Sequence, residues 1–346
     1  MNIQTLKTVS LYGISHLLVD MTCIMLLYSA VIYGKLEGGN AFIIIVLYNI
    51  LAFGLQSVIG DIFDKNKKPR VCAAIGCILT AAAALIYPHP VFAAIAAGIG
   101  NAAFHAGGGI VCLKAGKHKA SIPGIYVAPG AMGLFLGALL VQKFNYTPEF
   151  CAAVLFIAAA AILLFKETES ETVLKEENQI KYSRILIIAN LLLAAIVLRS
   201  FIGMSISLPW KSSSVLLAAL TAAVVLGKSL GGIAADKFGW MRVTVCALII
   251  SSPLIAFGIN HPVLYIIGIF FFNFTMPVTL TAIANIMPRR EGFAFGLTTL
   301  ALIIGAMPSF INIKLGAENA AAVFFIIILS AVLIYSGLRE YSKETV

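Results

Sequence analysis

The chain has 346 residues, of which 60% are hydrophobic and only 11% charged, and its mean hydropathy is +0.99. Soluble globular proteins carry about 25% charged residues, so this composition excludes a soluble domain and indicates a protein with many membrane spans. The formal net charge of +9 is accounted for by basic loops beside the membrane and requires no nucleic-acid partner.

Twelve apolar segments follow one another, each long enough to cross a hydrocarbon core of about 30 Å as a helix. Because they are continuously apolar and do not alternate, they predict helices and not the strands of a membrane barrel. The first half holds 8–33, 41–62, 70–88, 91–113, 122–142 and 147–165. The second half holds 184–208, 213–235, 242–259, 262–286, 292–313 and 319–338. We therefore expect an all-α polytopic membrane protein with twelve transmembrane helices.

One short pattern, Gly-x-x-x-Asp-Lys, ends an apolar segment at Gly60 and ends another at Gly232. The same offset, without a gap, aligns Arg70 with Arg242, His89 with His261, Asn101 with Asn273, Gly124 with Gly296, and Gly133 with Gly305. A repeat on this scale predicts two homologous halves, the design of many secondary transporters. We expect a six-helix bundle over 1–165, a cytoplasmic linker over 166–183 and a second six-helix bundle over 184–346.

Basic residues set the expected orientation, because they concentrate in cytoplasmic loops. Most of the 24 lysine and arginine residues fall in connections on the side of the N-terminus, whereas the opposite connections hold only Lys35, Lys143, Lys211 and Lys314. We therefore expect both termini in the cytoplasm and the chain in the inner (cytoplasmic) membrane. The first apolar run is too long for a cleavable signal peptide. The six cysteines show no metal spacing and are expected to be packing residues.

Two homologous halves of six segments, with the Gly-x-x-x-Asp-Lys pattern after segments two and eight, resemble the major facilitator superfamily over essentially the whole chain. The resemblance implies alternating access, with this motif closing one state of the carrier. The chain departs from the usual pattern at Lys67 and Trp240, which stand where a glycine and a basic residue are common. The expected gating residues are Gly60, Asp64, Lys65, Arg70, Gly232, Asp236, Lys237 and Arg242.

The motif has a physical rationale besides the resemblance. Its glycines let neighbouring helices approach closely. We expect Asp64 and Asp236 to accept hydrogen bonds from a facing helix N-terminus, or to pair with Arg70 or Arg242. The alternative is that the loops only set topology through their lysines.

A few polar residues lie at membrane depth, where a charge is costly and indicates function: His16, Asp20, His105, Arg199 and Lys228. The resemblance places segments one, four, seven and ten around a central cavity, to which Asn101, Asn273 and Thr275 would also contribute. Lys228 is expected to have a structural role, since it can reach the cytoplasmic side or pair with an acidic group.

His16 and Asp20 are four residues apart and share one helix face. A histidine beside a carboxylate exchanges protons near neutral pH, so we expect Asp20 to carry the coupling proton, His16 to tune it, and His105 to share it or contact substrate. The alternatives are a packing hydrogen bond for His105 and a structural ion pair of Asp20 with Arg199 or Lys228. Three scattered ligands are weak support for a metal, and we expect none.

Arg199 is permanently charged and offers planar donors suited to carboxylate or phosphate, which predicts an anionic or zwitterionic substrate. The expected substrate-binding residues are Arg199, Asn101, His105, Asn273 and Thr275. The residues around His16, His105 and Arg199 are similar to the fosmidomycin-resistance branch of efflux carriers, although Ala106 replaces its usual proline. The glycines Gly130, Gly133 and Gly137 loosely resemble an exporter signature, but tight helix packing explains them equally well.

These observations predict a proton-coupled secondary transporter that exports a small anionic or amphiphilic compound, such as an antibiotic, by antiport. Uptake of an anionic metabolite by proton symport is the alternative, since the same residues serve either direction. A transporter-like sensor or scaffold is an alternative of another class. The chain carries no G-x-S-x-G, H-E-x-x-H or P-loop pattern, so we expect no enzyme. We expect no cofactor, and a monomer that binds its substrate, protons and the lipid bilayer.

Overall fold

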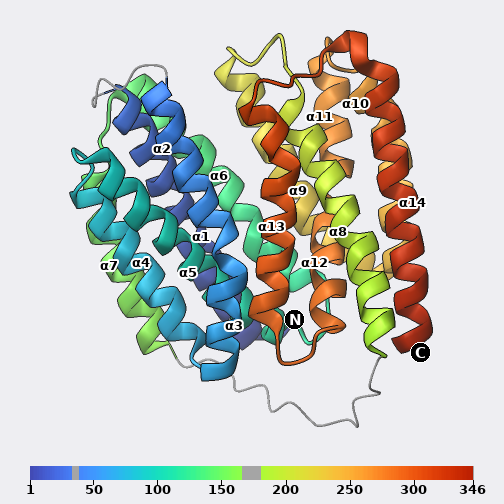
Figure 1. Ribbon diagram of the computed structural model, residues 1–346, viewed down its shortest axis with the longest axis horizontal. Coiled ribbons are helices and arrows are strands. Elements are labelled where there is room, and N and C mark those ends of the chain that lie inside the picture. The colour runs from blue at the N-terminus through green and yellow to red at the C-terminus, as the bar shows by residue number, and fades with distance from the viewer. Residues whose placement is uncertain (33–38, 166–180, 346) are drawn as a thin grey trace. The chain divides into compact units, whose positions relative to one another are not determined.

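The computed structural model describes residues 1–32, 39–165 and 181–345, which form helices joined by short connections (Figure 1). The expected linker over 166–183 falls mostly outside the described residues. The helices of the first half are α1 (Ile3–Ile32), α2 (Gly39–Asn49), the π-helix η1 (Ile50–Gly54), α3 (Gln56–Asn66), α4 (Pro69–Leu85), α5 (Pro90–Gly116), α6 (Ser121–Phe144) and α7 (Glu149–Leu164).

The second half is also helical. Its helices are α8 (Tyr182–Ser205), α9 (Ser214–Phe238), α10 (Trp240–Ala256), α11 (Pro262–Phe272), α12 (Thr275–Asn285), α13 (Glu291–Phe310), the short η2 (Ala317–Asn319) and α14 (Ala320–Thr345). Each of the twelve apolar segments expected from the sequence coincides with helix, and the all-α prediction is confirmed. Helix α14 continues past the predicted end of its segment at 338.

Nine helices among the described residues are long and apolar enough to cross a membrane, by length and composition. In that set α2, η1 and α3 form one continuous element, as do α11 and α12. The three remaining apolar helices, α4, α7 and α10, have 16 or 17 residues. Large apolar side chains such as Phe92, Ile157 and Leu164 are exposed along the helices, as expected for surfaces that face hydrocarbon.

Two predicted segments contain an interruption that the sequence analysis did not anticipate. The segment 41–62 includes the π-turn η1, a feature that is frequent at functional sites. The segment 262–286 is divided at Asn273 and Phe274 into α11 and α12. Pro277 explains the second break, because proline has no N–H to donate to the carbonyl four residues earlier and its ring clashes with that turn.

The chain divides into two compact units. The first comprises Met1–Ala115, Tyr126–Thr168 and Arg290–Leu300, and the second comprises Gly116–Ile125, Glu169–Arg289 and Ala301–Val346. Three of the unit boundaries therefore fall within helices, namely in α6, in α13 and before the last residue of α5. In the first unit α4 packs against α7 and α1, and in the second α14 packs against α8 and α10 (Figure 1).

Glycines allow the helices of the first unit to approach closely enough to build a site between them. A Cβ atom on Gly133 of α6 would overlap the Leu17 carbonyl oxygen of α1, and one on Gly76 of α4 would overlap the Phe104 backbone of α5. These overlaps involve main-chain atoms that cannot move aside independently. The two glycines thus hold α6 close to α1 and α4 close to α5.

Candidate functional site

Helix α1 supplies the first two members of a buried polar cluster. His16 and Asp20 lie one helical turn apart, and His16 Nε2 is 3.2 Å from Asp20 Oδ2. Both residues are buried, with exposed fractions of 4% and 9%. The predicted pairing on one helix face is therefore present in the structure, and it lies in a place that bulk water does not reach freely.

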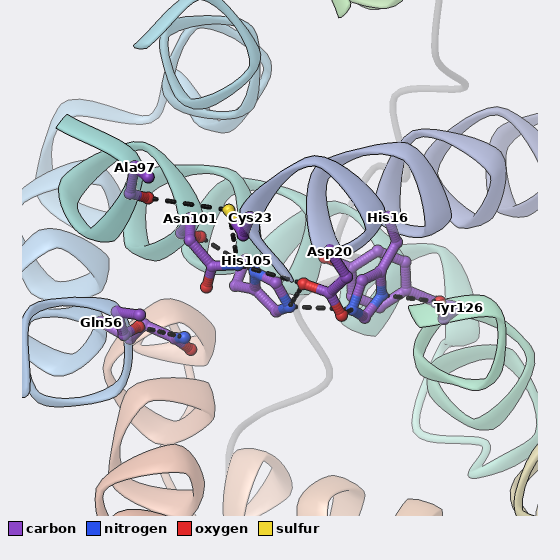
Figure 2. Close-up of polar contacts among 9 residues, drawn as sticks. His16, Asp20, Cys23, Gln56, Ala97, Asn101, His105 and Tyr126 are labelled. Atoms are coloured by element: carbon purple, nitrogen blue, oxygen red, sulfur yellow. Dashed lines mark hydrogen bonds and ion pairs between the residues drawn. The ribbon is translucent and has the colours of Figure 1, made fainter. Parts of the chain in front are cut away.

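Helix α5 supplies the facing residues, Asn101 and His105. Asn101 Nδ2 donates a hydrogen bond of 3.0 Å to Asp20 Oδ1, and it also contacts Cys23 Sγ at 3.8 Å. His105 Nε2 lies 2.8 Å from His16 Nε2 and 3.6 Å from Asp20 Oδ1. Figure 2 shows these side chains pointing toward one another from α1 and α5.

Helix α6 closes the cluster with backbone atoms. His16 Nδ1 donates to the Tyr126 carbonyl oxygen at 3.0 Å (Figure 2). A Cβ atom on Gly130 would overlap His16 Nε2 and would lie 2.5 Å from Asp20 Oδ2. A side chain at position 130 therefore cannot coexist with the cluster as it stands.

The cluster combines one carboxylate with two imidazoles and one amide in an apolar interior. Burying an isolated charge is costly unless it is paired, so Asp20 depends on its neighbours in α1 and α5. His16, Asp20 and His105 each offer one ligand atom, and these atoms lie within 4.8 Å of one another, which is also compatible with a metal ion. A group of this composition can bind and release a cation, with the proton as the smallest.

The second unit holds Arg199 of α8, which is buried to the same degree, with 8% exposed. Its Nη2 donates to the Phe272 carbonyl oxygen at 3.2 Å, and its guanidinium lies 5.0 Å from the centre of the Phe272 ring. Its Nε is buried and has no hydrogen-bond partner in the described part of the chain. Among the described residues of its own unit, no carboxylate forms an ion pair with Arg199.

The other residues expected to bind substrate lie at the break between α11 and α12. Thr275 Oγ1 donates to the Phe272 carbonyl oxygen at 3.1 Å, so Thr275 and Arg199 meet at the same acceptor. Asn273 Nδ2 instead donates to Ile269 of its own helix at 2.8 Å. The structure thus joins Asn101 to the polar cluster but gives its repeat counterpart a local, capping contact.

The motif aspartates both accept hydrogen bonds from helix N-termini, the first of the two contacts expected for them. Asp64 accepts from the backbone N–H groups of Gly292 and Phe293 at 3.0 and 2.9 Å, at the start of α13. Asp236 accepts from Ala120 and Ser121, both at 2.9 Å, at the start of α6. Each carboxylate therefore satisfies two otherwise unpaired amide groups and faces the positive end of a helix dipole.

The glycines of the motif make these contacts possible. A Cβ atom on Gly60 would overlap the Gly292 carbonyl oxygen, and one on Gly232 would lie 2.7 Å from the Ala120 carbonyl oxygen. The glycine and the aspartate of each motif thus act together, one by admitting a helix end and the other by bonding to it.

The basic residues of the motif have other partners. Arg70 donates to the Phe165 carbonyl oxygen at 2.7 Å rather than to Asp64. Lys65 pairs with Asp61 at 2.5 Å, and Arg290 pairs with the other oxygen of Asp61 at 2.7 Å. Asp61 was assigned no role from the sequence, although its spacing of four residues from Lys65 is typical of a helical ion pair.

Trp240 stands where the resemblance leads one to expect a basic residue, and the structure gives it a related function. Its Nε1–H donates to Asp236 Oδ1 at 3.0 Å, and its indole stacks on Tyr341 with ring centroids 5.8 Å apart. Trp240 therefore supplies a donor to the motif carboxylate without a charge.

Comparison with solved structures shows which known proteins share this fold. No family model and no curated protein matches the chain. An alanine variant of the E. coli fucose:proton symporter FucP superposes with a TM-score of 0.65 at 11% sequence identity, with 99% of each chain covered. A structure of FucP, a major facilitator superfamily transporter in an outward conformation, gives 0.59 at 12% identity and covers 96% of this chain and 99% of the other. At this level of sequence identity, the likeness shows that the chain shares the fold of these two structures.

Proposed function

We propose that this protein is a proton-coupled secondary transporter of a small anionic compound, and that its helices form twelve spans in two pseudo-symmetric six-helix bundles. The observation that carries this proposal is the buried cluster of Asp20, His16 and His105. A transporter fold supplies the route for a substrate, and a titratable cluster inside it supplies a binding site for the driving ion.

The cluster suits proton binding because it places two imidazoles beside a buried carboxylate. Histidine titrates closer to neutral pH than any other unperturbed side chain. A carboxylate beside an imidazole stabilises its protonated form, and burial makes the uncompensated charge unfavourable. Binding or loss of one proton therefore changes the net charge of this interior, which is what a coupled carrier requires.

Arg199 supports the proposal that the substrate is anionic. Its guanidinium is buried, it has an unbonded Nε, and it lies beside Thr275 at the break between α11 and α12. A carboxylate or phosphate would satisfy the free donor and neutralise the charge at once. We propose Arg199 and Thr275 as substrate-binding residues, with Asn101 and His105 acting through the proton site and Asn273 shaping the break.

The direction of transport has two candidates. The residues around His16, His105 and Arg199 are similar to efflux carriers, which favours export by proton antiport. Two solved structures that share the fold are of FucP, a fucose:proton symporter, which favours uptake by symport as the second candidate. Protonation of the same cluster drives either process, since the direction depends on whether proton and substrate occupy the carrier together or in turn.

Asp64 and Asp236 are proposed as gating residues in either direction. Each holds the first turn of a helix by two hydrogen bonds from backbone amides, a contact that forms or breaks as a unit. In alternating access, such contacts stabilise one state and have to be broken to reach the other.

The test is substrate-dependent proton movement in inside-out vesicles, monitored with a pH-sensitive dye over a panel of small anions and antibiotics. We expect a proton flux in the wild type that the double variant Asp20→Asn/His105→Gln lacks, while counterflow exchange of labelled substrate persists. The sign of the flux distinguishes antiport from symport. A double variant that still moves protons with substrate would exclude this cluster as the coupling site.

A further inference from the structure

We infer that His16 and His105 hold one proton between their facing Nε2 atoms, while Asp20 stays ionised beside them as a fixed counter-ion. The role of this proton in transport rests on the proposed function, but the geometry that requires it lies within one compact unit. The inference differs from the expectation that Asp20 itself carries the proton.

The outer nitrogens of the two rings determine their tautomers. His16 Nδ1 lies 3.0 Å from the Tyr126 carbonyl oxygen, and His105 Nδ1 lies 2.9 Å from the Asn101 carbonyl oxygen. A carbonyl oxygen can only accept a hydrogen bond, so each Nδ1 carries a hydrogen. In a neutral imidazole with Nδ1–H, the Nε2 atom has a lone pair and no hydrogen.

The two Nε2 atoms nevertheless lie 2.8 Å apart, which is a hydrogen-bond distance. Two lone pairs would repel each other at this separation, so a proton has to lie between them. A proton on Asp20 does not remove this repulsion, because both Nε2 atoms would still face each other without a hydrogen between them. The contact requires one imidazolium that donates to one neutral imidazole.

The surroundings of Asp20 fit an ionised carboxylate. Its Oδ1 accepts from Asn101 Nδ2 at 3.0 Å, and its Oδ2 lies 3.2 Å from His16 Nε2. An imidazolium and a carboxylate at this separation stabilise each other's charged forms. His16 is closer to the carboxylate than His105, whose Nε2 is 3.6 Å away, so His16 is the favoured donor. The loaded cluster is then electrically neutral.

Among the described residues of the first unit, no other charged side chain forms an ion pair with Asp20. Other titratable side chains that interact with Asp20 from the packed helices include thiol and phenol groups on α1, α2 and α6, namely Cys23, Tyr48 and Tyr126. The thiols of α4 and α5 that interact with Tyr126 are Cys72, Cys77 and Cys112. Thiols and phenols are neutral at physiological pH. The charge of this interior therefore depends on Asp20 and the histidine pair.

Release of the proton has a mechanical consequence. One Nε2–H bond breaks, the proton leaves to water, and both imidazoles become neutral with their lone pairs facing. The contact between the two Nε2 atoms is then repulsive, and the Asp20 carboxylate loses its counter-charge. The two rings have to separate, and since His16 belongs to α1 and His105 to α5, proton occupancy is linked to the contact between these helices.

A metal ion is the competing occupant, because the same three side chains can ligate one. Zinc bound tetrahedrally at about 2.05 Å holds its ligand atoms roughly 3.3 Å apart. The two Nε2 atoms are closer than that, so an ion would require them to move apart, whereas a proton fits them as they lie.

The experiment is NMR of the full-length protein with ¹⁵N-labelled histidine, in lipid nanodiscs and without substrate. The chain has five histidines, which makes assignment by substitution practical. We expect a ¹⁵N–¹⁵N coupling across the hydrogen bond between two imidazole nitrogens, present at neutral pH and lost in both His16→Gln and His105→Gln. His89, which lies in the connection between α4 and α5, provides the matched control, and His89→Gln should leave the coupling unchanged. Size-exclusion profiles and thermal unfolding establish that each variant is folded.

The Asp20→Asn variant distinguishes a proton held between the two histidines from a proton held by Asp20. If Asp20 is a fixed counter-ion, the coupling persists in this variant but disappears at a lower pH, because the pair holds its proton about tenfold or more less tightly. Absence of the coupling at every pH in folded wild-type protein, or a carboxyl proton found on Asp20, would overturn the inference. So would a coupling that forms only after a chelator removes a bound metal. None of these readouts depends on transport, so the proton site and the proposed function can fail separately.

Discussion

Asp64 and Asp236 occupy equivalent positions in the repeat, and each accepts two hydrogen bonds from the start of a helix. The amide groups they bind are equivalent as well, because the same register aligns Ala120 with Gly292 and Ser121 with Phe293. The two contacts are therefore equivalent. The aspartate from the first half of the sequence binds the start of α13, and the aspartate from the second half binds the start of α6. Each stabilises a helix N-terminus by charge and by direct bonding.

Asparagine at either position tests this equivalence. Asp64→Asn and Asp236→Asn each remove the charge and one of two acceptors, which leaves a backbone N–H unpaired. We expect each variant to lose about 1–3 kcal/mol of unfolding free energy in detergent, measured by denaturation. The control is Asp61→Asn, which disturbs only ion pairs near the surface and should cost less than about 1 kcal/mol. A loss confined to one of the two motif aspartates would contradict the equivalence.

The two halves of the repeat share a helix-packing contact but differ in the polar residues beside it. Gly133 and Gly305 share an overlap with a backbone carbonyl, at Leu17 and Val197 respectively, and this shared contact aligns α1 with α8. With Leu17 matched to Val197, Asp20 corresponds to Ser200. In the register of the motif, Gly130 corresponds to Leu302, and the Ser200 hydroxyl donates to the Leu302 carbonyl oxygen at 2.6 Å. The carboxylate and the glycine that admits it are thus both specific to the first unit, as expected for a specialised site on a duplicated frame.

Alanine substitutions at Gly130 and Gly133 distinguish effects on the polar cluster from effects on helix packing. Gly130→Ala places a methyl group against side-chain atoms of His16 and Asp20, which can shift at an over-packing cost of about 1–3 kcal/mol. We expect folded protein with substrate-dependent proton movement reduced about tenfold or more. Gly133→Ala meets the Leu17 backbone instead, so we expect lower yield and a lower unfolding temperature. The measurements are yield, thermal unfolding and dye-monitored proton flux. Normal coupling in Gly130→Ala would show that the cluster tolerates rearrangement.

Local sequence was sufficient to predict the helices and part of the site. Continuous apolar length identified all twelve segments, and a spacing of four placed His16 and Asp20 on one face. The acidic residue of the repeated motif indicated a bond either to a helix N-terminus or to an arginine, and tertiary packing decides between them and determines which helix is bound. The contact of His105 with His16 joins residues far apart in the chain and depends on the register of α5 against α1, which no single-sequence pattern encodes.

Two residues make contacts that the sequence did not indicate, and each contact has a physical reason. Asn101 and Asn273 align in the repeat and were both expected to bind substrate; among the described residues, Asn101 bonds to the carboxylate of Asp20. Asn273 donates to the turn before it, beside the break at Pro277. That proline was visible in the sequence, and it lies in the first turn of α12, directly after the break. The bond of Arg70 to Phe165, in place of Asp64, reflects a facing helix end that the loop sequence does not reveal.

The orientation in the membrane stays a prediction and can be tested with two cysteine substitutions in a cysteine-free background. Lys343→Cys lies near the C-terminus, and Lys211→Cys lies in a connection expected on the outer side. We expect a membrane-impermeant thiol reagent to label Lys211→Cys in intact cells and Lys343→Cys only in inverted vesicles, because basic loops stay cytoplasmic. The reverse labelling pattern would invert the predicted topology, and each substitution serves as the control for the other.

Arg199 tests the proposed class of substrate. Arg199→Ala removes the buried guanidinium, and we expect the apparent affinity for anionic substrates to fall about ten- to a hundredfold, the equivalent of one charge-assisted hydrogen bond of about 1.5–3 kcal/mol. Neutral compounds that the carrier accepts should be affected little. Arg199→Lys keeps the charge without the planar donors and should recover only part of the loss. The measurement is competition of unlabelled compounds with labelled substrate in counterflow.

A matched control comes from Arg184, whose ion pair with Glu340 lies partly exposed at 2.6 Å. Because such pairs contribute little, Arg184→Ala should leave substrate affinity unchanged. If Arg199→Ala weakened neutral and anionic compounds equally, the residue would act through the structure of the α11–α12 break, where it bonds the Phe272 carbonyl. Arg199 would then hold the site in shape, and the anionic character of the substrate would have to be sought elsewhere in the protein.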